Sequence, residues 1–453
     1  MTSSATEHAK DSGNALINGR VRDLYDLVTG DEQARVCSDI SDDACRQQPT
    51  NFFIYLVSLL ANKAGDLLAS PKLVLPWLLA TLGAPMWMAG MLVPIRESLA
   101  LLPQLVVAGW MRKQPVRKWF WVAGAGAQGL SVLGMIGAAV LFKPVTAGAL
   151  VLALLVAFSL GRGVCSVSYK DVQGKTIAKT RRGTLSGYAA SAAGGLAVVL
   201  GLLLWLLPAA RAELWPILIL LAIAGVLWIA GAIIFAALRE YPGATEGGGN
   251  AIKVAFASVD LIRSKPGFAR FIAVRGLLVA TALTAPFYTH LARSHGGSEI
   301  GNLAILLALS GLASLVSAPF WGRFSDRSSR RVLMIVGAAA AVLNILVAAL
   351  ALSPAGHALG IWPFALAYFL LAGIHAGVRL GRKTYLTDLG SRDNRAQLTA
   401  VANTTIGIVL LIGGGLVAAI ASLGADYAVA FLALPALAAA VLARSLPEVE
   451  QRD

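Results

Sequence analysis

Two basic stretches decide the fold: GWMRKQPVRK at residues 109–118 and GRFSDRSSRR at residues 322–331, which begin 213 positions apart. Each follows a long apolar segment. The same offset places Arg182 on Arg395, in a second pair of loops. One offset shared by two separate loops indicates that the chain contains two similar halves arranged in parallel.

The composition around these loops is that of an integral membrane protein. Of the 453 residues, 57% are apolar or aromatic and only 14% are charged, which argues against a cytosolic enzyme. Stretches of about 20 apolar residues can each cross a bilayer as a helix. We predict an all-α polytopic membrane protein with twelve transmembrane helices in two pseudo-symmetric six-helix bundles. The spans fall near 52–82, 86–111, 119–142, 147–168, 184–207, 215–238, 268–291, 300–321, 332–352, 362–381, 398–422 and 427–443.

The spans divide the chain into five regions. We expect a cytoplasmic acidic N-terminal tail (1–50), an N-terminal six-helix bundle (51–238), a cytoplasmic linker (239–267), a C-terminal bundle (268–445) and a cytoplasmic C-terminal tail (446–453). Apolar residues at helical spacing predict a short amphipathic helix in the linker and another, near Tyr25, in the N-terminal tail.

The placement of basic residues predicts the orientation. The net charge is +14, although the first 50 residues hold five basic and nine acidic residues. Loops on one predicted side of the membrane carry only Lys143, Arg211 and Arg293, whereas the opposite loops carry most of the remaining Lys and Arg. By the positive-inside rule both termini face the cytoplasm. Basic residues gathered in short loops beside apolar spans argue against a nucleic-acid partner.

The basic stretches resemble the signature of the major facilitator superfamily, Gly-x-x-x-Asp-Arg/Lys-x-Gly-Arg/Lys-Arg/Lys. Helix number, loop lengths and two-fold symmetry extend the resemblance over residues 51–445. In the first copy, Lys113 stands where the family has Asp. The second copy matches at Gly322, Asp326, Arg327, Arg330 and Arg331, and the first keeps Gly109, Arg117 and Lys118.

The resemblance implies that these loops form a cytoplasmic gate. The glycine would let two helices approach closely, and Asp326 would pair with a cation or a helix N-terminus when the inner side is shut. Lys113 reverses one expected charge, so the first-half gate would need other partners, such as Asp388 or Asp393 of the other half. The alternative is that the Lys and Arg side chains serve only topology and lipid headgroups.

Ionisable residues inside the spans are candidates for a functional site, because each costs about 2.5–3.5 kcal/mol to insert. In the resembling family, the first, fourth, seventh and tenth helices line a central cavity, and most of these residues fall on those helices. His375 also lies 213 positions after Arg162. The candidate pathway residues are Lys63, Asp66, Arg96, Glu97, Arg162, Arg275, His375 and Arg379.

The acidic members of this set suggest coupling to protons. A carboxyl group as deep as Asp66 would take up a proton unless it is paired, as proton-coupled transport requires. The alternative is a permanent ion pair with Lys63, three residues earlier on the same helix face. Glu97 is the weaker candidate for coupling.

The basic members suggest an anionic solute. Five Lys or Arg residues stand against two carboxylates, and Arg can hold a carboxylate or phosphate through two parallel hydrogen bonds. The alternative is that Arg162, Arg275 and Arg379, which lie toward the cytoplasmic ends of their spans, only extend to the headgroups.

Together these features predict a secondary active transporter, not an enzyme, that moves a small solute by alternating access. We expect a monomer in the plasma (inner) membrane, whose partners are the bilayer and a small-molecule substrate. The anionic substrate and the coupling to protons suggested above would complete this set of partners. We expect no cofactor or metal, and no GxxxxGK[ST] motif for ATP binding is present. The alternatives are a membrane-embedded enzyme acting on a lipid-like substrate and a transporter-like sensor that signals through the acidic tail.

Overall fold

The structure, a computed structural model, describes residues 19–28, 40–206, 214–243, 245, 262, 264–390 and 395–449. Within these residues all regular structure is helical. Eleven helical segments of this part are long and apolar enough to cross a membrane. The predicted first span is a twelfth helical segment, which is more polar and is interrupted. The all-α polytopic fold is therefore confirmed, and the chain is an integral membrane protein.

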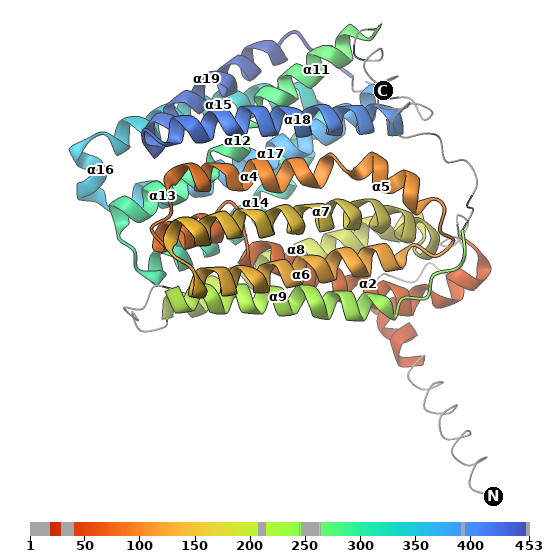
Figure 1. Cartoon of the computed structure of the whole chain (residues 1–453). Helices are drawn as coiled ribbons and strands as arrows, with labels where there is room; N and C mark the ends of the chain where they lie inside the picture. The colour runs from red at the N-terminus through yellow and green to blue at the C-terminus, as the bar shows by residue number, and fades with distance from the viewer. Residues whose placement is uncertain are drawn as a thin grey trace, which may run out of the picture.

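The N-terminal half begins at α2 and ends at α9 (Figure 1). Pro144 starts α7 at the first helical position, where a missing N–H costs nothing. The helices are α2 (Asp42–Leu68), α3 (Val74–Thr81), α4 (Met86–Leu101), α5 (Gln104–Met111), α6 (Lys118–Leu141), α7 (Pro144–Thr176), α8 (Lys179–Leu206) and α9 (Leu214–Ala236).

The C-terminal half runs from α11 to α19. Ser328 caps α15, because its hydroxyl oxygen accepts a hydrogen bond from the backbone N–H of Arg331 at 3.2 Å. The helices are α11 (Pro266–Leu277), α12 (Ala280–Leu283), α13 (Ala285–Gly296), α14 (Ile300–Arg327), α15 (Ser329–Ala351), α16 (Pro354–Leu359), α17 (Trp362–Leu389), α18 (Arg395–Ala421) and α19 (Ala425–Ala443).

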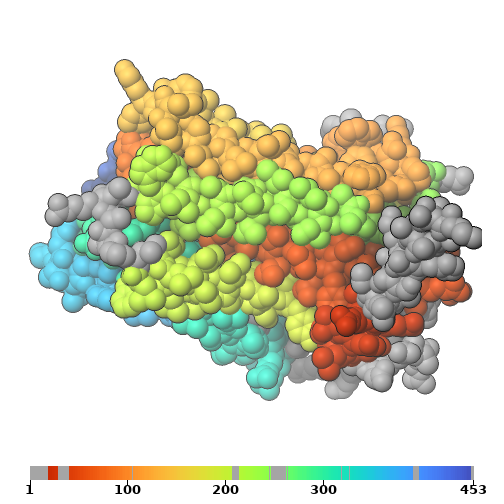
Figure 2. All heavy atoms as spheres, turned by 90° about the horizontal axis from the view of Figure 1, so that it is seen from below, coloured from red at the N-terminus to blue at the C-terminus, as the bar shows by residue number. Residues whose placement is uncertain are grey.

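The two halves meet along two helix pairs that the 213-residue offset relates to each other. Helix α4 packs on α18, and α8 packs on α14. Figure 2 shows one face of the molecule, where α2, α8 and α9 lie beside one another and α14 borders α8. Gly194 and Gly201 of α8 allow the close approach to α14, because a side chain at Gly201 would meet the backbone of Ala308 at 2.8 Å. Small residues at a helix interface permit such contacts in membranes.

The first membrane segment of each half is broken. Helix α2 ends at Leu68 and α3 begins at Val74, with Pro71, which has no backbone N–H, in the turn between them. The break between α12 and α13 falls at Thr284, 213 positions after Pro71. The sequence predicted one continuous span over residues 52–82. Interrupted helices near the middle of a membrane are typical of solute-binding sites in transporters.

Several helices extend beyond the predicted spans. Helix α2 begins at Asp42, where Ser41 accepts a hydrogen bond from the N–H of Ala44 at 3.3 Å. Helix α7 continues to Thr176 and α17 to Leu389. The prediction followed apolar content, which marks the bilayer, whereas a capped polar turn can continue a helix into water.

The N-terminal tail contains the predicted helix. Residues 19–28 are helical, and Tyr25 is buried against the ring of Phe52. The Tyr25 hydroxyl accepts a hydrogen bond from the Gln48 side chain at 2.7 Å. This part of the tail therefore docks on the start of α2. The amphipathic helix predicted in the linker lies largely outside the described residues.

Candidate functional site

A cavity of about 400 Å³ lies between the two halves. It is lined by α2, α4 and α7 of the first half and by α11, α12 and α17 of the second, together with the turn between α2 and α3. Most of the predicted pathway residues meet here, and Lys63 is the one that does not line the cavity. Those that do are Asp66, Arg96, Glu97, Arg162, Arg275, His375 and Arg379.

Asp66 lies between two arginines of its own half. One carboxylate oxygen accepts a hydrogen bond from Arg96 Nη2 at 2.8 Å, and the other lies 3.2 Å from Arg162 Nη2. Arg162 also donates to Asn62 Oδ1 at 2.7 Å. The alternative ion pair between Asp66 and Lys63 is wrong, because the salt bridges of Asp66 are with these arginines.

Arg275 approaches the cavity from the second half. Its side chain is only 6% exposed, and Nη2 donates to Asn403 Oδ1 at 2.9 Å. The Nε atom is buried without a hydrogen-bond partner. Arg275 thus lies inside the protein and does not extend to the headgroups. The amide nitrogen of Asn403 in turn donates a hydrogen bond across the halves, to Gln104 Oε1 at 3.4 Å.

Lys72, in the turn between α2 and α3, joins the halves through a chain of polar contacts. Its Nζ lies 3.8 Å from Glu97 Oε1 and 3.1 Å from His375 Nε2. The other ring nitrogen of His375 lies 3.0 Å from Thr281 Oγ1, whose hydroxyl donates to the carbonyl of Leu278 at 2.9 Å. If the ammonium of Lys72 donates to Nε2, then the proton of a neutral His375 is on Nδ1.

The sequence analysis missed two cations of this cavity, Lys72 and Arg382. Lys72 falls within the predicted first span, and Pro71 beside it was the available signal for a break. Arg382 follows the predicted end of the tenth span at residue 381 and was assigned to a loop. In the structure α17 continues to Leu389, so Arg382 is one helical turn from Arg379 and lines the same cavity.

Helices α3 and α13, one from each half, pack on each other beyond the cavity-lining turn at Lys72. Figure 1 places α13 at the end of the molecule that is distant from the chain termini, which we call the closed end. Thr289 donates to the carbonyl oxygen of Lys72 at 2.8 Å. Arg293 lies 3.5 Å from the Thr81 hydroxyl, and its guanidinium is 5.7 Å from the ring centre of Trp77. These polar contacts accompany apolar packing, because Trp77 of α3 and Leu291 of α13 belong to one buried hydrophobic cluster.

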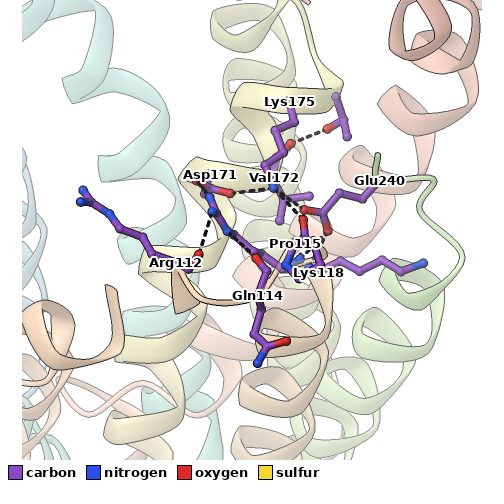
Figure 3. Close-up of polar contacts among 10 residues, drawn as sticks. Arg112, Gln114, Pro115, Lys118, Asp171, Val172, Lys175 and Glu240 are labelled. Carbon is purple, nitrogen blue, oxygen red and sulfur yellow. Dashed lines mark hydrogen bonds and ion pairs between the residues drawn. The ribbon is translucent and has the colours of Figure 1, made fainter. Parts of the chain in front are cut away.

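The loop at residues 109–118 is tied to acidic residues of its own half, as Figure 3 shows around Asp171 and Glu240. Arg117 Nη1 lies 2.5 Å from Asp171 Oδ1, and its backbone N–H bonds the Glu240 carboxylate. Lys118 and Lys175 also contact that carboxylate, at 2.7 and 2.9 Å. The sequence suggested partners from the other half instead, Asp388 or Asp393, and Asp393 lies outside the described residues.

The loop at residues 322–331 has a similar connection in the second half. Arg330 Nη2 lies 2.7 Å from Glu448 Oε1, and the Ser328 hydroxyl donates to Glu448 Oε2 at 3.0 Å. Glu240 follows α9 and Glu448 follows α19, so each loop binds a glutamate just after the last helix of its half. The close helix approach expected at Gly322 is wrong, because a side chain there would meet nothing within 4 Å.

The remaining motif residues are placed as follows. Lys113 and Arg327 are exposed. The backbone N–H of Arg331 donates to the hydroxyl oxygen of Ser328. Gly109 lies on α5 and Asp326 on α14, in the last turn or so of each helix. In the described part of the chain no three His, Cys, Asp or Glu side chains come together as a metal site.

Comparison with known proteins agrees with this architecture. The family model described as Major Facilitator Superfamily matches residues 271–453. The resemblance to the major facilitator superfamily is confirmed. A search of curated proteins finds no significant match.

Several solved structures of transporters share the fold of this chain. They include a D-xylose-proton symporter (10% identity, 88% of this chain and 98% of that chain, TM-score 0.67). A nucleoside transporter, NupG, matches at 14% identity over 88% of this chain and 98% of that one, with a TM-score of 0.62. A peptide transporter, POT, in complex with sulfate matches at 12% identity over 92% and 98%, with a TM-score of 0.65. At these identities the comparison establishes the fold alone.

Proposed function

We propose that this protein is a secondary transporter that carries a small organic anion through the cavity between its two halves. The observation that supports this most is the charge of the cavity lining. Six cationic side chains face two carboxylates there, and Arg275 is buried with an unpaired Nε. Such an excess of cations favours a negatively charged solute. The peptide transporter with bound sulfate shows that a protein of this fold can accommodate an oxyanion.

The arrangement also supports alternating access. The halves meet at the cavity through small sets of polar contacts, such as Lys72 with His375 and Gln104 with Asn403. Rocking of one half against the other would break one set and form another. Basic loops at the end that carries the chain termini support a cytoplasmic position for that end in the plasma (inner) membrane. The loops at residues 109–118 and 322–331 would then form the cytoplasmic gate.

Asp66 is the proposed site of proton coupling. In the present state its charge is balanced by Arg96 and Arg162. An anionic solute that binds Arg162 would draw this arginine away from Asp66. With one cation fewer beside it, the Asp66 carboxylate would bind a proton more readily. Binding of solute and proton would thereby be linked. Glu97, which is more exposed and faces Lys72, remains the weaker candidate.

Purified protein in liposomes tests this proposal. Pooled organic anions, and a second pool of neutral and cationic solutes, are offered with and without an imposed proton gradient, and uptake is measured by mass spectrometry. We expect gradient-driven uptake by the wild type. Asp66→Asn should abolish accumulation against a gradient but retain exchange of solute across the membrane. Unchanged accumulation would contradict the role of Asp66, and uptake confined to neutral or cationic solutes would contradict the proposed function.

A further inference from the structure

The cations of the cavity differ in how far their charge is already balanced. On the N-half wall, defined as Asp66, Lys72, Arg96, Glu97 and Arg162, every cation has an acidic neighbour. Asp66 bridges two arginines at 2.8 and 3.2 Å, and Glu97 lies 3.8 Å from the lysine ammonium. This wall therefore offers a solute few unpaired charges.

The C-half wall, defined as Arg275, His375, Arg379 and Arg382, contains no carboxylate. Arg275 has the neutral Asn403 as its hydrogen-bond partner. Arg379 and Arg382 make no hydrogen bond or salt bridge with any residue that the structure describes. Glu97 faces them across the cavity, but its ion pair is with Lys72.

The three arginines act on one another. Arg382 lies near enough to Arg275 and to Arg379 for their charges to repel, and Glu97 attracts Arg379 and Arg382 across the cavity. Of the three, Arg275 is buried, Arg382 is half-buried and Arg379 is exposed. An uncompensated buried charge is strongly unfavourable, so a bound anion would stabilise this wall most at Arg275. A solute with one negative charge would leave two of the three arginine charges unbalanced. A solute with two negative charges would leave only one unbalanced. A planar guanidinium also suits an oxyanion with several acceptor oxygens.

We infer that the C-half wall binds a doubly charged oxyanion group, of the kind found in a phosphate monoester, and that this group is the part of the solute the transporter selects. The inference rests on the proposed function and makes its substrate class specific. The rest of the solute would occupy the remainder of the cavity, beside Ser70, Gln104 and Ser166.

Two small esters of nearly equal size test the charge requirement. Methyl phosphate carries about two negative charges above pH 7, because its second pKa is near 6, whereas dimethyl phosphate carries one. Binding to the purified full chain at pH 8 is measured by ligand-induced thermal stabilisation over a concentration series. We expect methyl phosphate to bind about tenfold more tightly than dimethyl phosphate, as the loss of one charge-assisted hydrogen bond predicts.

Variants assign that preference to the wall. In Arg382→Gln the preference should fall to about threefold or less, and Arg382→Lys should keep most of it. Arg270→Gln is the matched control, because Arg270 is an exposed arginine of α11 outside the cavity. The inference would be overturned if both esters stabilised the wild type equally or if neither stabilised it. This comparison uses the wild type alone and so does not depend on the folding of any variant.

The same series separates this inference from the proposed function. If acetate and dimethyl phosphate bind as well as methyl phosphate and anion uptake persists in liposomes, the double-charge requirement fails and anion transport stands. If the protein carries only neutral or cationic solutes, both fail.

Discussion

The two walls of the cavity differ in how far carboxylates balance the charges of their cations. The N-half wall holds both carboxylates, and its cations are paired with them, whereas the C-half wall holds cations without a carboxylate. The two halves are related by a 213-residue offset, yet Asp66 has Val279 as its counterpart and Glu97 has Ser310. The duplicated framework therefore carries two differently charged walls, and the proposed function assigns the response to protons to one wall and the binding of an anion to the other.

The largest effect should follow removal of a C-half cation. Arg275→Gln is expected to weaken binding of the transported anion about 30-fold or more, because a buried charge that contacts the solute is lost. Arg162→Gln on the opposite wall should have a smaller effect, since Asp66 already neutralises Arg162. Equilibrium binding to both purified variants checks the order, and an equal loss in the two would remove the distinction between the walls.

The two basic loops also differ, because the glutamate bound by the first loop is buried and the glutamate bound by the second is partly exposed. The Glu240 side chain is fully buried and binds two backbone N–H groups and Lys175, whereas Glu448 is about one-third exposed. Glu240→Gln should lower the free energy of unfolding by about 2 kcal/mol, and Glu448→Gln by less than about 1 kcal/mol.

Thermal unfolding of the two purified variants in one detergent measures this difference. A Glu448 variant that loses more stability than the Glu240 variant would show that the loops are not held as described.

A smaller effect of opposite sign is expected at Glu97. Glu97→Gln removes a carboxylate from the N-half wall and leaves Lys72 without its acidic neighbour, so that the positive charge of Lys72 can act on a solute in the cavity. Anion affinity should rise about threefold, because the carboxylate is partly exposed and its field is screened. The measurement is the same equilibrium binding at low and high salt. A fall in affinity would mean that Glu97 contacts the solute directly.

Much of this division could be predicted from sequence. Charged residues are costly in apolar helices, so Asp66, Arg96 and Arg275 were visible as candidates without any structure. The helix ends were harder, because apolar content reports the bilayer and not the last helical turn, and Arg382 was lost for that reason. Pairing was harder still: Lys63 is close to Asp66 in sequence, whereas Arg96 on α4 and Arg162 on α7 are distant. Only the packing of these helices beside α2 brings the two arginines to Asp66.

The loops show the same limit. The motif predicted an ionic role for Asp326, and Asp388 or Asp393 as partners of the first-half gate. The acidic partners of Arg117 and Arg330 are instead Asp171, Glu240 and Glu448, which lie outside the motif. Glu240 and Glu448 follow the last helix of each half, and only the folded bundle brings those ends beside the basic loops.

The central claim, that the halves move apart to expose the cavity, is tested most directly by joining them at the closed end. Thr81→Cys on α3 and Arg293→Cys on α13 place two thiols across that closure, in a background without the natural cysteines. A cleavable bifunctional thiol reagent is applied to protein in liposomes, and exchange of labelled anion is followed. The account predicts that cross-linking reduces exchange to the level of empty liposomes and that cleavage of the linker restores it. Exchange at an undiminished rate in the fully cross-linked protein would contradict it.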